Sequence, residues 1–152
     1  MTELWALDAR EQIRHTVAAY AVAGDSGRLD ELAEQFVDDG VLEVHGQDQA
    51  QGRAAIVAML RRHAAGGAPP AGGAPFFIRH FVTNVLIDPL TPTEARAVAY
   101  FAVLTPDGLD HWGRYRDVFV PAGERWLLRH RVARVDSSVP GGWYRRTFAE
   151  SD

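Results

Sequence analysis

Two segments of the sequence carry side chains that could move protons. Tyr20 and Asp25 stand near the end of the first helical stretch, and His80 lies in the middle of a strand-like run. An imidazole exchanges protons near neutral pH, and a hydrogen-bonded carboxylate can hold it in one tautomer. Each residue also has an ordinary structural interpretation. Asp25 could cap a helix or close a turn, His80 could be a core histidine bonded to backbone, and Tyr20 could be a core side chain.

A later strand-like run adds polar groups that could contact a ligand. Because alternate residues of a strand face opposite sides, His111, Tyr115 and Asp117 share one face. Gly113 lies between the histidine and the tyrosine, where its missing side chain leaves room for a ligand or a neighbouring backbone. We expect Asp117 to pair with an arginine of the adjacent strand, and the candidates are Arg129 and Arg131.

The same alternation assigns His80 and Asn84 to one face of residues 76–88. The remaining members of that face are apolar, which is the composition expected of a ligand pocket; they are Phe76, Ile78, Val82 and Leu86. The opposite face is apolar enough to need covering as well. We therefore expect helices on one side of the sheet and a partner subunit on the other, in a homo-oligomer such as a dimer or trimer.

These segments must be positioned by three helices and a sheet. Helical spacing predicts a first helix over about residues 8–24, a second short helix with Leu29, Leu32 and Phe36 on one face, and a third helix after Gly52. A short strand is predicted at 41–45, and longer strands at 76–88, 94–105, 109–120 and 126–136. Short connections between the long runs indicate antiparallel pairing. The Gly/Pro-rich residues 66–75 are predicted to form a loop. The fold class is therefore α+β.

Composition excludes several function classes. The 152-residue chain has the length of a single domain, a net charge of −4 and no basic run, so no nucleic-acid partner is expected. It has no cysteine and no lysine, which excludes thiol and Schiff-base chemistry. The six histidines lack metal-ligand spacing, and no phosphate-binding glycine loop follows a strand, so neither a metal nor a cofactor is expected. Without a membrane-spanning or secretory segment, we expect a cytoplasmic protein.

An ordered set of motifs spans most of the chain. Over roughly residues 5–136 it resembles the SnoaL-like branch of the nuclear transport factor 2-like superfamily. The motifs are Tyr20-x4-Asp25-x-Gly27-x2-Asp30-x-Leu32, Phe36-x2-Asp39-Gly40, Gly52-x3-Ile56, Arg79-His80-x2-Thr83-Asn84, Gly113-x-Tyr115-x-Asp117 and Trp126-x4-Arg131. The resemblance implies one SnoaL-like domain over residues 1–152, with a C-terminal tail at 137–152. It also implies a cone-shaped α+β barrel, with three N-terminal helices packed on a curved, mostly antiparallel sheet around a pocket.

Within that superfamily, Asp25 and His80 resemble the catalytic aspartate and one catalytic histidine of scytalone dehydratase. That enzyme's second histidine has no counterpart at Thr105-Pro106-Asp107, and its tyrosine beside the aspartate is replaced by Gly24. His111 and His45 are the alternative proton donors. His15 and His63 lie among helical charges and are expected in solvent.

The leading hypothesis is a cofactor-free enzyme of the dehydratase, isomerase or cyclase type. It would act by proton transfer on a small, apolar, cyclic or polyketide-like molecule. Asp25 and His80 would be catalytic, and the expected substrate-binding residues are Tyr20, Asn84, His111 and Tyr115. The alternative is a non-catalytic ligand-binding or assembly subunit, like the small subunits of ring-hydroxylating dioxygenases. The aromatic pair Trp143-Tyr144 would cover the pocket or pack on a partner subunit, but a surface tail with aromatic anchors is the favoured interpretation.

Overall fold

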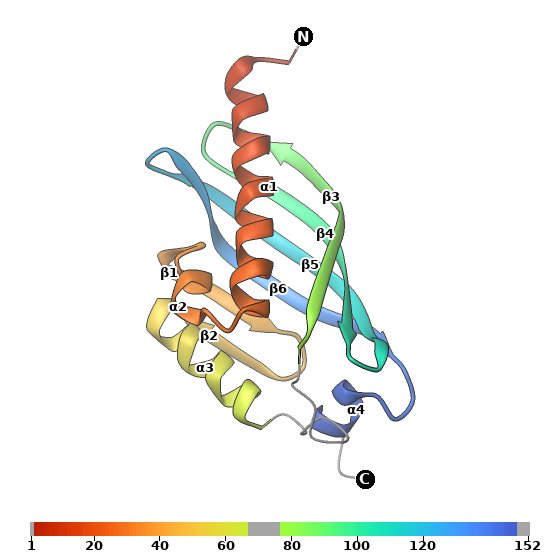
Figure 1. Cartoon of the computed structure of the whole chain (residues 1–152). Coiled ribbons are helices and arrows are strands. Elements are labelled where there is room, and N and C mark those ends of the chain that lie inside the picture. Colours follow the sequence, from red (N-terminus) through yellow and green to blue (C-terminus); the bar gives the residue numbers. More distant parts are fainter. Residues whose placement is uncertain (1, 67–76, 149–152) are drawn as a thin grey trace.

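A computed structural model describes residues 2–66 and 77–148 of the chain (Figure 1). Four helices and six strands follow one another along these residues. In chain order they are α1 (Leu4–Asp25), α2 (Leu29–Ala33), β1 (Phe36–Val44), β2 (Asp48–Gln51), α3 (Arg53–Ala65), β3 (Arg79–Leu90), β4 (Ala95–Thr105), β5 (Gly108–Ala122), β6 (Arg125–Ser138) and α4 (Trp143–Phe148).

The six strands form one mixed sheet in the order β2-β1-β6-β5-β4-β3. The long strands β3 to β6 pair antiparallel with their sequence neighbours, as the short connections predict. β1 pairs with β6 in parallel, and β2, α3, β3, β4 and β5 lie between these two strands in sequence. The α+β class is thus confirmed, but the sheet is open, with β2 and β3 as its edges, and does not close into a barrel.

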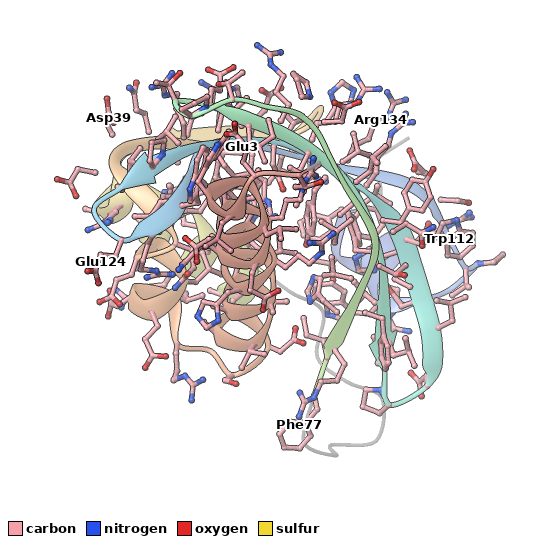
Figure 2. All side chains as sticks on the ribbon, turned by 90° about the horizontal axis from the view of Figure 1, so that it is seen from above. Glu3, Asp39, Phe77, Trp112, Glu124 and Arg134 are labelled. Carbon is pink, nitrogen blue, oxygen red and sulfur yellow. The ribbon has the colours of Figure 1, made fainter. Side chains whose placement is uncertain are left out.

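Helix α1 lies along the concave side of the sheet, and the sheet curves around it when seen from above (Figures 1 and 2). Its buried face carries Ile13, Val17 and Tyr20, which recur at helical spacing. The hydroxyl of Thr16, also buried, donates a 2.6 Å hydrogen bond to the carbonyl oxygen of Trp126 on β6. This contact joins the middle of the helix to the sheet and helps to fix the position of the C-terminal end of α1 relative to the sheet.

Several element boundaries differ from those that the sequence predicts. Helix α1 begins at Leu4, one turn before the predicted start. Phe36 opens β1 instead of closing the second helix, and β2 and α4 were not predicted. Both missed elements are short, and short elements depend on packing more than on local propensity. The predicted loop at 66–75 lies, apart from Gly66, outside the described residues.

A β-bulge in β3 changes which residues face the helices. The register with β4 shifts between Thr83 and Leu86, and Asn84 has a φ of 55°. Such a φ is sterically unfavourable for most residues, and asparagine tolerates it better than most. Beyond the bulge Ile87 points into the core and Leu86 is exposed. The predicted alternation therefore holds from Ile78 through Val82 and is wrong at Asn84 and Leu86, while Phe76 lies outside the described residues.

Candidate active site

A cavity of about 680 Å³ lies at the end of the fold where α1 finishes. Its lining comes from the ends of α1 and α3, from α2, from the start of β3 and the residues just before it, from β5 and from α4. Most lining side chains are apolar. Five can ionise, and they are Tyr20, Asp25, His63, His80 and Tyr115. Ionisable groups on an otherwise apolar wall are the arrangement expected of a catalytic pocket.

Asp25 and His80 form a doubly hydrogen-bonded pair in this wall. The Nδ1 of His80 lies 2.6 Å from Oδ1 of Asp25, and the backbone N–H of His80 donates to Oδ2 at 2.9 Å. The aspartate side chain is 9% exposed and the histidine side chain 25%. Because the carboxylate accepts a hydrogen bond from Nδ1–H, the neutral imidazole carries its proton on Nδ1 and its lone pair on Nε2. Such a histidine can act as a general base.

The chain positions this pair through two rigid elements. Asp25 is the last residue of α1, which the turn at Gly27, with a φ of 70°, ends immediately afterwards. His80 is the second residue of β3, and its ladder partner is Val103 of β4. The backbone hydrogen bond from His80 to Asp25 joins the helix end to the strand. The imidazole therefore has a fixed orientation, set by a strand and a helix and not by a loop.

Behind the Asp25–His80 pair, called here the dyad, Tyr20 and Tyr115 enclose a buried arginine. Arg131 is 0% exposed, and its guanidinium carbon lies 4.2 Å from the ring centroid of Tyr20 and 3.9 Å from that of Tyr115. The two tyrosine rings meet edge to face at 6.1 Å, and Phe101 stacks on Tyr115 at 4.7 Å. These contacts fix both rings against the cavity.

The electrostatics of this cluster keep the phenols neutral. Burial raises the pKa of Tyr20, although the Arg131 guanidinium opposes it. Burial also raises the pKa of Tyr115 far above its ordinary value. Burial works against the charge of Arg131, but Asp117 outweighs that effect and the pKa of Arg131 is raised. Both tyrosines are therefore hydrogen-bond donors across the physiological range.

His111 lies beside the cavity and does not line it. Its Nδ1 is 2.7 Å from Oδ2 of Asp110, and the ring is covered by Tyr144 at 4.7 Å and by Trp143 at 6.1 Å. Burial lowers the pKa of His111, the Asp110 carboxylate opposes this, and nearby His80 adds to the lowering. The sequence predicted that His111, Tyr115 and Asp117 lie on one face of the strand, and this is confirmed, since all three are buried. Because His111 is outside the lining, its position does not support the predicted contact with substrate.

The other polar residues considered in the sequence analysis differ in whether they line the cavity. Asn84 is exposed at the bulge and is not a lining residue, so its position does not support a role in substrate binding. His45 follows the end of β1 and is also outside the lining. His63 lines the cavity from the last turn of α3, and the expectation that it is simply solvated is wrong. His15 is exposed, as predicted.

Comparison with known proteins gives the family. The SnoaL-like domain matches residues 5–132. The chain belongs to the SnoaL-like domain family. No protein of curated function matches the sequence.

Solved structures similar to this SnoaL-like protein include one from Catenulispora acidiphila in complex with S-DNPA. That protein is 31% identical, with a TM-score of 0.69 over 84% of this chain and 92% of that one. A putative scytalone dehydratase from Novosphingobium aromaticivorans is 24% identical, with a TM-score of 0.69 over 86% and 85% of the two chains. The beta subunit of a putative aromatic-ring-hydroxylating dioxygenase from the same organism is 22% identical, with a TM-score of 0.67 over 88% and 93%. The last two likenesses show the fold alone.

For three residues in or behind this SnoaL-like pocket, the sequence offered no position or an undecided one. His63 reaches the cavity because α3 ends beside it, which no local pattern reveals. Arg131 was predicted only as a partner of Asp117, although its place in the Trp126-x4-Arg131 motif could have indicated a buried role. Trp143 was expected in a surface tail, with a place over the pocket as one alternative, and it is a lining residue.

Among residues 2–66 and 77–148, no group of three or more histidine, aspartate or glutamate side chains is arranged to hold a metal ion. Within the same ranges, no helix combines the length and apolar character needed to cross a membrane.

Proposed function

We propose that this SnoaL-like protein is an acid–base enzyme that dehydrates, isomerises or cyclises a small apolar molecule without a cofactor. The observation that carries the proposal is the Asp25–His80 pair, with a 2.6 Å contact between carboxylate and Nδ1 at the wall of a cavity of about 680 Å³. An oriented histidine beside an apolar cavity is suited to removing a proton next to a carbonyl group.

The proposed reaction begins with the lone pair on Nε2 of His80. It takes a proton from the carbon next to a substrate carbonyl, and the C–H electrons form an enolate. Asp25 stabilises the resulting imidazolium through the hydrogen bond at Nδ1. The phenols of Tyr20 and Tyr115 donate hydrogen bonds to the enolate oxygen, where the negative charge develops. In a dehydration, the enolate then expels a hydroxyl group that takes the proton from Nε2 and leaves as water. In an isomerisation, the proton returns to another carbon.

The composition of the wall supports the proposed substrate class. Leu29, Leu32, Leu60 and Ile78 supply apolar surface around the ionisable groups. A compact cyclic or polyketide-like molecule would bury its carbon skeleton against these side chains and direct its carbonyl toward the tyrosines. S-DNPA, bound by the Catenulispora acidiphila protein, is the first ligand to test.

We also propose that the protein forms homo-oligomers through the outer face of the sheet. Trp112 and Arg134 point away from α1 in Figure 2. Phe81, Tyr100 and Trp112 are between 37% and 56% exposed, which is unusual for neighbouring aromatic side chains on one face. A second subunit would cover them. Light scattering should give the mass of a dimer or trimer, and a monomer at micromolar concentration would contradict this proposal.

The function is tested by comparing variants of the dyad with a matched control. Wild type, Asp25→Asn and His80→Ala are assayed for turnover of β-hydroxy ketones on bicyclic aromatic skeletons, by the absorbance of the conjugated product. Asp30→Asn is the control, because this aspartate is exposed on α2. We expect losses of about 10²–10⁴-fold in both dyad variants and wild-type rates in the control. Equal turnover in all four proteins rejects the acid–base assignment. Binding of S-DNPA with no turnover of any substrate favours the non-catalytic alternative.

A further inference from the structure

The chain after β6 returns to the open end of the fold and supplies part of the cavity wall. Residues 139–148, called here the tail segment, end in α4 (Figure 1). Trp143, the first residue of α4, is one of the lining residues. The acid–base pair therefore shares its cavity with a large flat side chain that comes from the far end of the chain.

A buried carboxylate anchors the tail segment. Asp110 is 2% exposed and accepts hydrogen bonds from the backbone N–H groups of Trp143, at 2.5 Å, and Tyr144, at 3.0 Å. Its own carbonyl oxygen accepts the N–H of Val139 at 2.8 Å. A Cβ at Gly142 would lie 2.6 Å from the Asp110 carboxylate, so only glycine permits this close approach. The anchor thus depends on one particular acid and one particular glycine.

Aromatic contacts then set the orientation of the indole. The Trp143 ring is stacked on His111 with an interplanar angle of 28°, and Tyr144 also packs on that histidine. The hydroxyl of Tyr144 accepts a 2.9 Å hydrogen bond from Nε2 of Gln47, between β1 and β2. The tail segment is therefore attached to β5 and to the β1–β2 turn, and the position of Trp143 is fixed from both sides.

We propose that Trp143 is a specificity-determining residue that gives the pocket a preference for flat aromatic rings, and that Asp110 is the positioning residue that holds it there. A flat indole gains more from an aromatic ring than from a puckered saturated ring, because offset-stacked or edge-to-face contacts add to the burial of area. This inference deepens the proposed function, since it assigns an aromatic substrate class to the same cavity.

The test measures binding and needs no turnover. The probes are 1-naphthol and 1-decalol, which share one carbon skeleton and differ in flatness, and their dissociation constants are measured by calorimetry. In Trp143→Ala, 1-naphthol should bind about tenfold more weakly, while 1-decalol changes much less. Trp143→Phe should restore most of the preference. Trp5→Ala is the control, because Trp5 lies near the start of α1 and is not a lining residue.

The role of Asp110 is tested with the same pair of probes. Asp110→Asn places an amide donor where the carboxylate accepts N–H groups, so we expect the ratio of the two dissociation constants to move toward the value of Trp143→Ala. Asp107→Asn, an exposed turn residue, should keep the wild-type ratio. Circular dichroism shows whether each variant is folded. If Asp110→Asn does not fold, Gly142→Ala replaces it and should move the ratio in the same direction.

The outcomes separate this inference from the proposed function. A ratio that is unchanged in Trp143→Ala overturns the inference, as does wild type that binds neither probe at millimolar concentration. If the ratio depends on Trp143 but Asp25→Asn keeps full turnover, the acid–base assignment fails and the specificity residue stands. If turnover depends on the dyad but the ratio does not depend on Trp143, the acid–base assignment stands and the specificity role of Trp143 fails.

Discussion

Asp117 holds Arg131 through two parallel hydrogen bonds inside the sheet. The Nε–Oδ1 distance is 2.8 Å, the Nη2–Oδ2 distance is 2.7 Å, and both side chains are almost fully buried. This pairing confirms one of the two predicted partners of Asp117. It also explains how a full positive charge can lie beneath the tyrosines of the pocket, because an unpaired guanidinium there would have no compensation for its lost hydration.

Removing one partner of this pair should be costly. In Asp117→Ala the guanidinium loses both hydrogen bonds while remaining buried, and breaking a buried pair on one side costs about 3–5 kcal/mol of the free energy of unfolding. Urea denaturation followed by circular dichroism measures this value. Asp136→Ala, which removes a half-exposed carboxylate paired with Arg114 and Arg134, is the control and should cost at most about 1 kcal/mol. Similar losses in the two variants would contradict the buried pairing.

His111 should make the stability of the protein depend on pH. Burial lowers its pKa in the folded state, so the unfolded chain binds a proton at a higher pH than the folded chain does. Stability contributed by the neutral ring is complete above the unfolded pKa of about 6.5 and is lost progressively as pH falls from there toward the lower folded value. The free energy of unfolding should therefore decrease between pH 7 and pH 5.5.

A variant separates this effect from that of other titrating groups. His111→Phe keeps an aromatic ring between Phe101 and Tyr144 but cannot be protonated. Its stability should vary less with pH than that of wild type over the same range. His15→Asn removes an exposed histidine and should keep the wild-type dependence. Identical pH dependence in wild type and His111→Phe would rule out a lowered pKa at this site.

The backbone at Asn84 gives a prediction that concerns β3 and not the pocket. A β-branched residue at a φ of 55° is strained, so Asn84→Val should lower the free energy of unfolding by about 1–3 kcal/mol. Asn84→Gly should be close to neutral, since glycine adopts positive φ readily. Thermal unfolding of both variants measures the difference. A valine variant as stable as the glycine variant would show that the bulge does not require this conformation.

The sequence predicted the parts of the site that obey a local period. Strand alternation correctly placed His111, Tyr115 and Asp117 on one face. Helical spacing correctly predicted that Tyr20 lies on the buried face of its helix. Alternation failed at Asn84, because a bulge adds a residue that no period reports. The sequence left open whether Gly113 makes room for a ligand or for a neighbouring backbone. It makes room for the backbone, since a Cβ there would lie 1.9 Å from the carbonyl oxygen of Arg134.

Sequence reasoning could not decide which residues of distant segments reach the pocket. His63 and Trp143 enter it from α3 and α4, and their direction depends on how those helices pack on the finished sheet. Asp25 and His80 are 55 positions apart, and only the resemblance to a family linked them before the structure showed their contact. Local patterns therefore supplied the elements and the chemistry-bearing residue types, while tertiary packing determined which of those residues meet.

The tyrosine pair offers the last test, of charge stabilisation in the proposed reaction. Tyr115→Phe removes the phenol but keeps the ring stacked on Phe101 and over Arg131. A hydrogen bond to a charged enolate contributes about 1.5–3 kcal/mol, so kcat/KM should fall about 10- to 150-fold on a substrate that wild type converts. Most of the loss should be in kcat, because the charge develops only in the transition state. Tyr100→Phe, on the exposed face of β4, should behave as wild type. A loss confined to KM would mean that Tyr115 binds the substrate without stabilising the enolate, and would transfer that role to Tyr20.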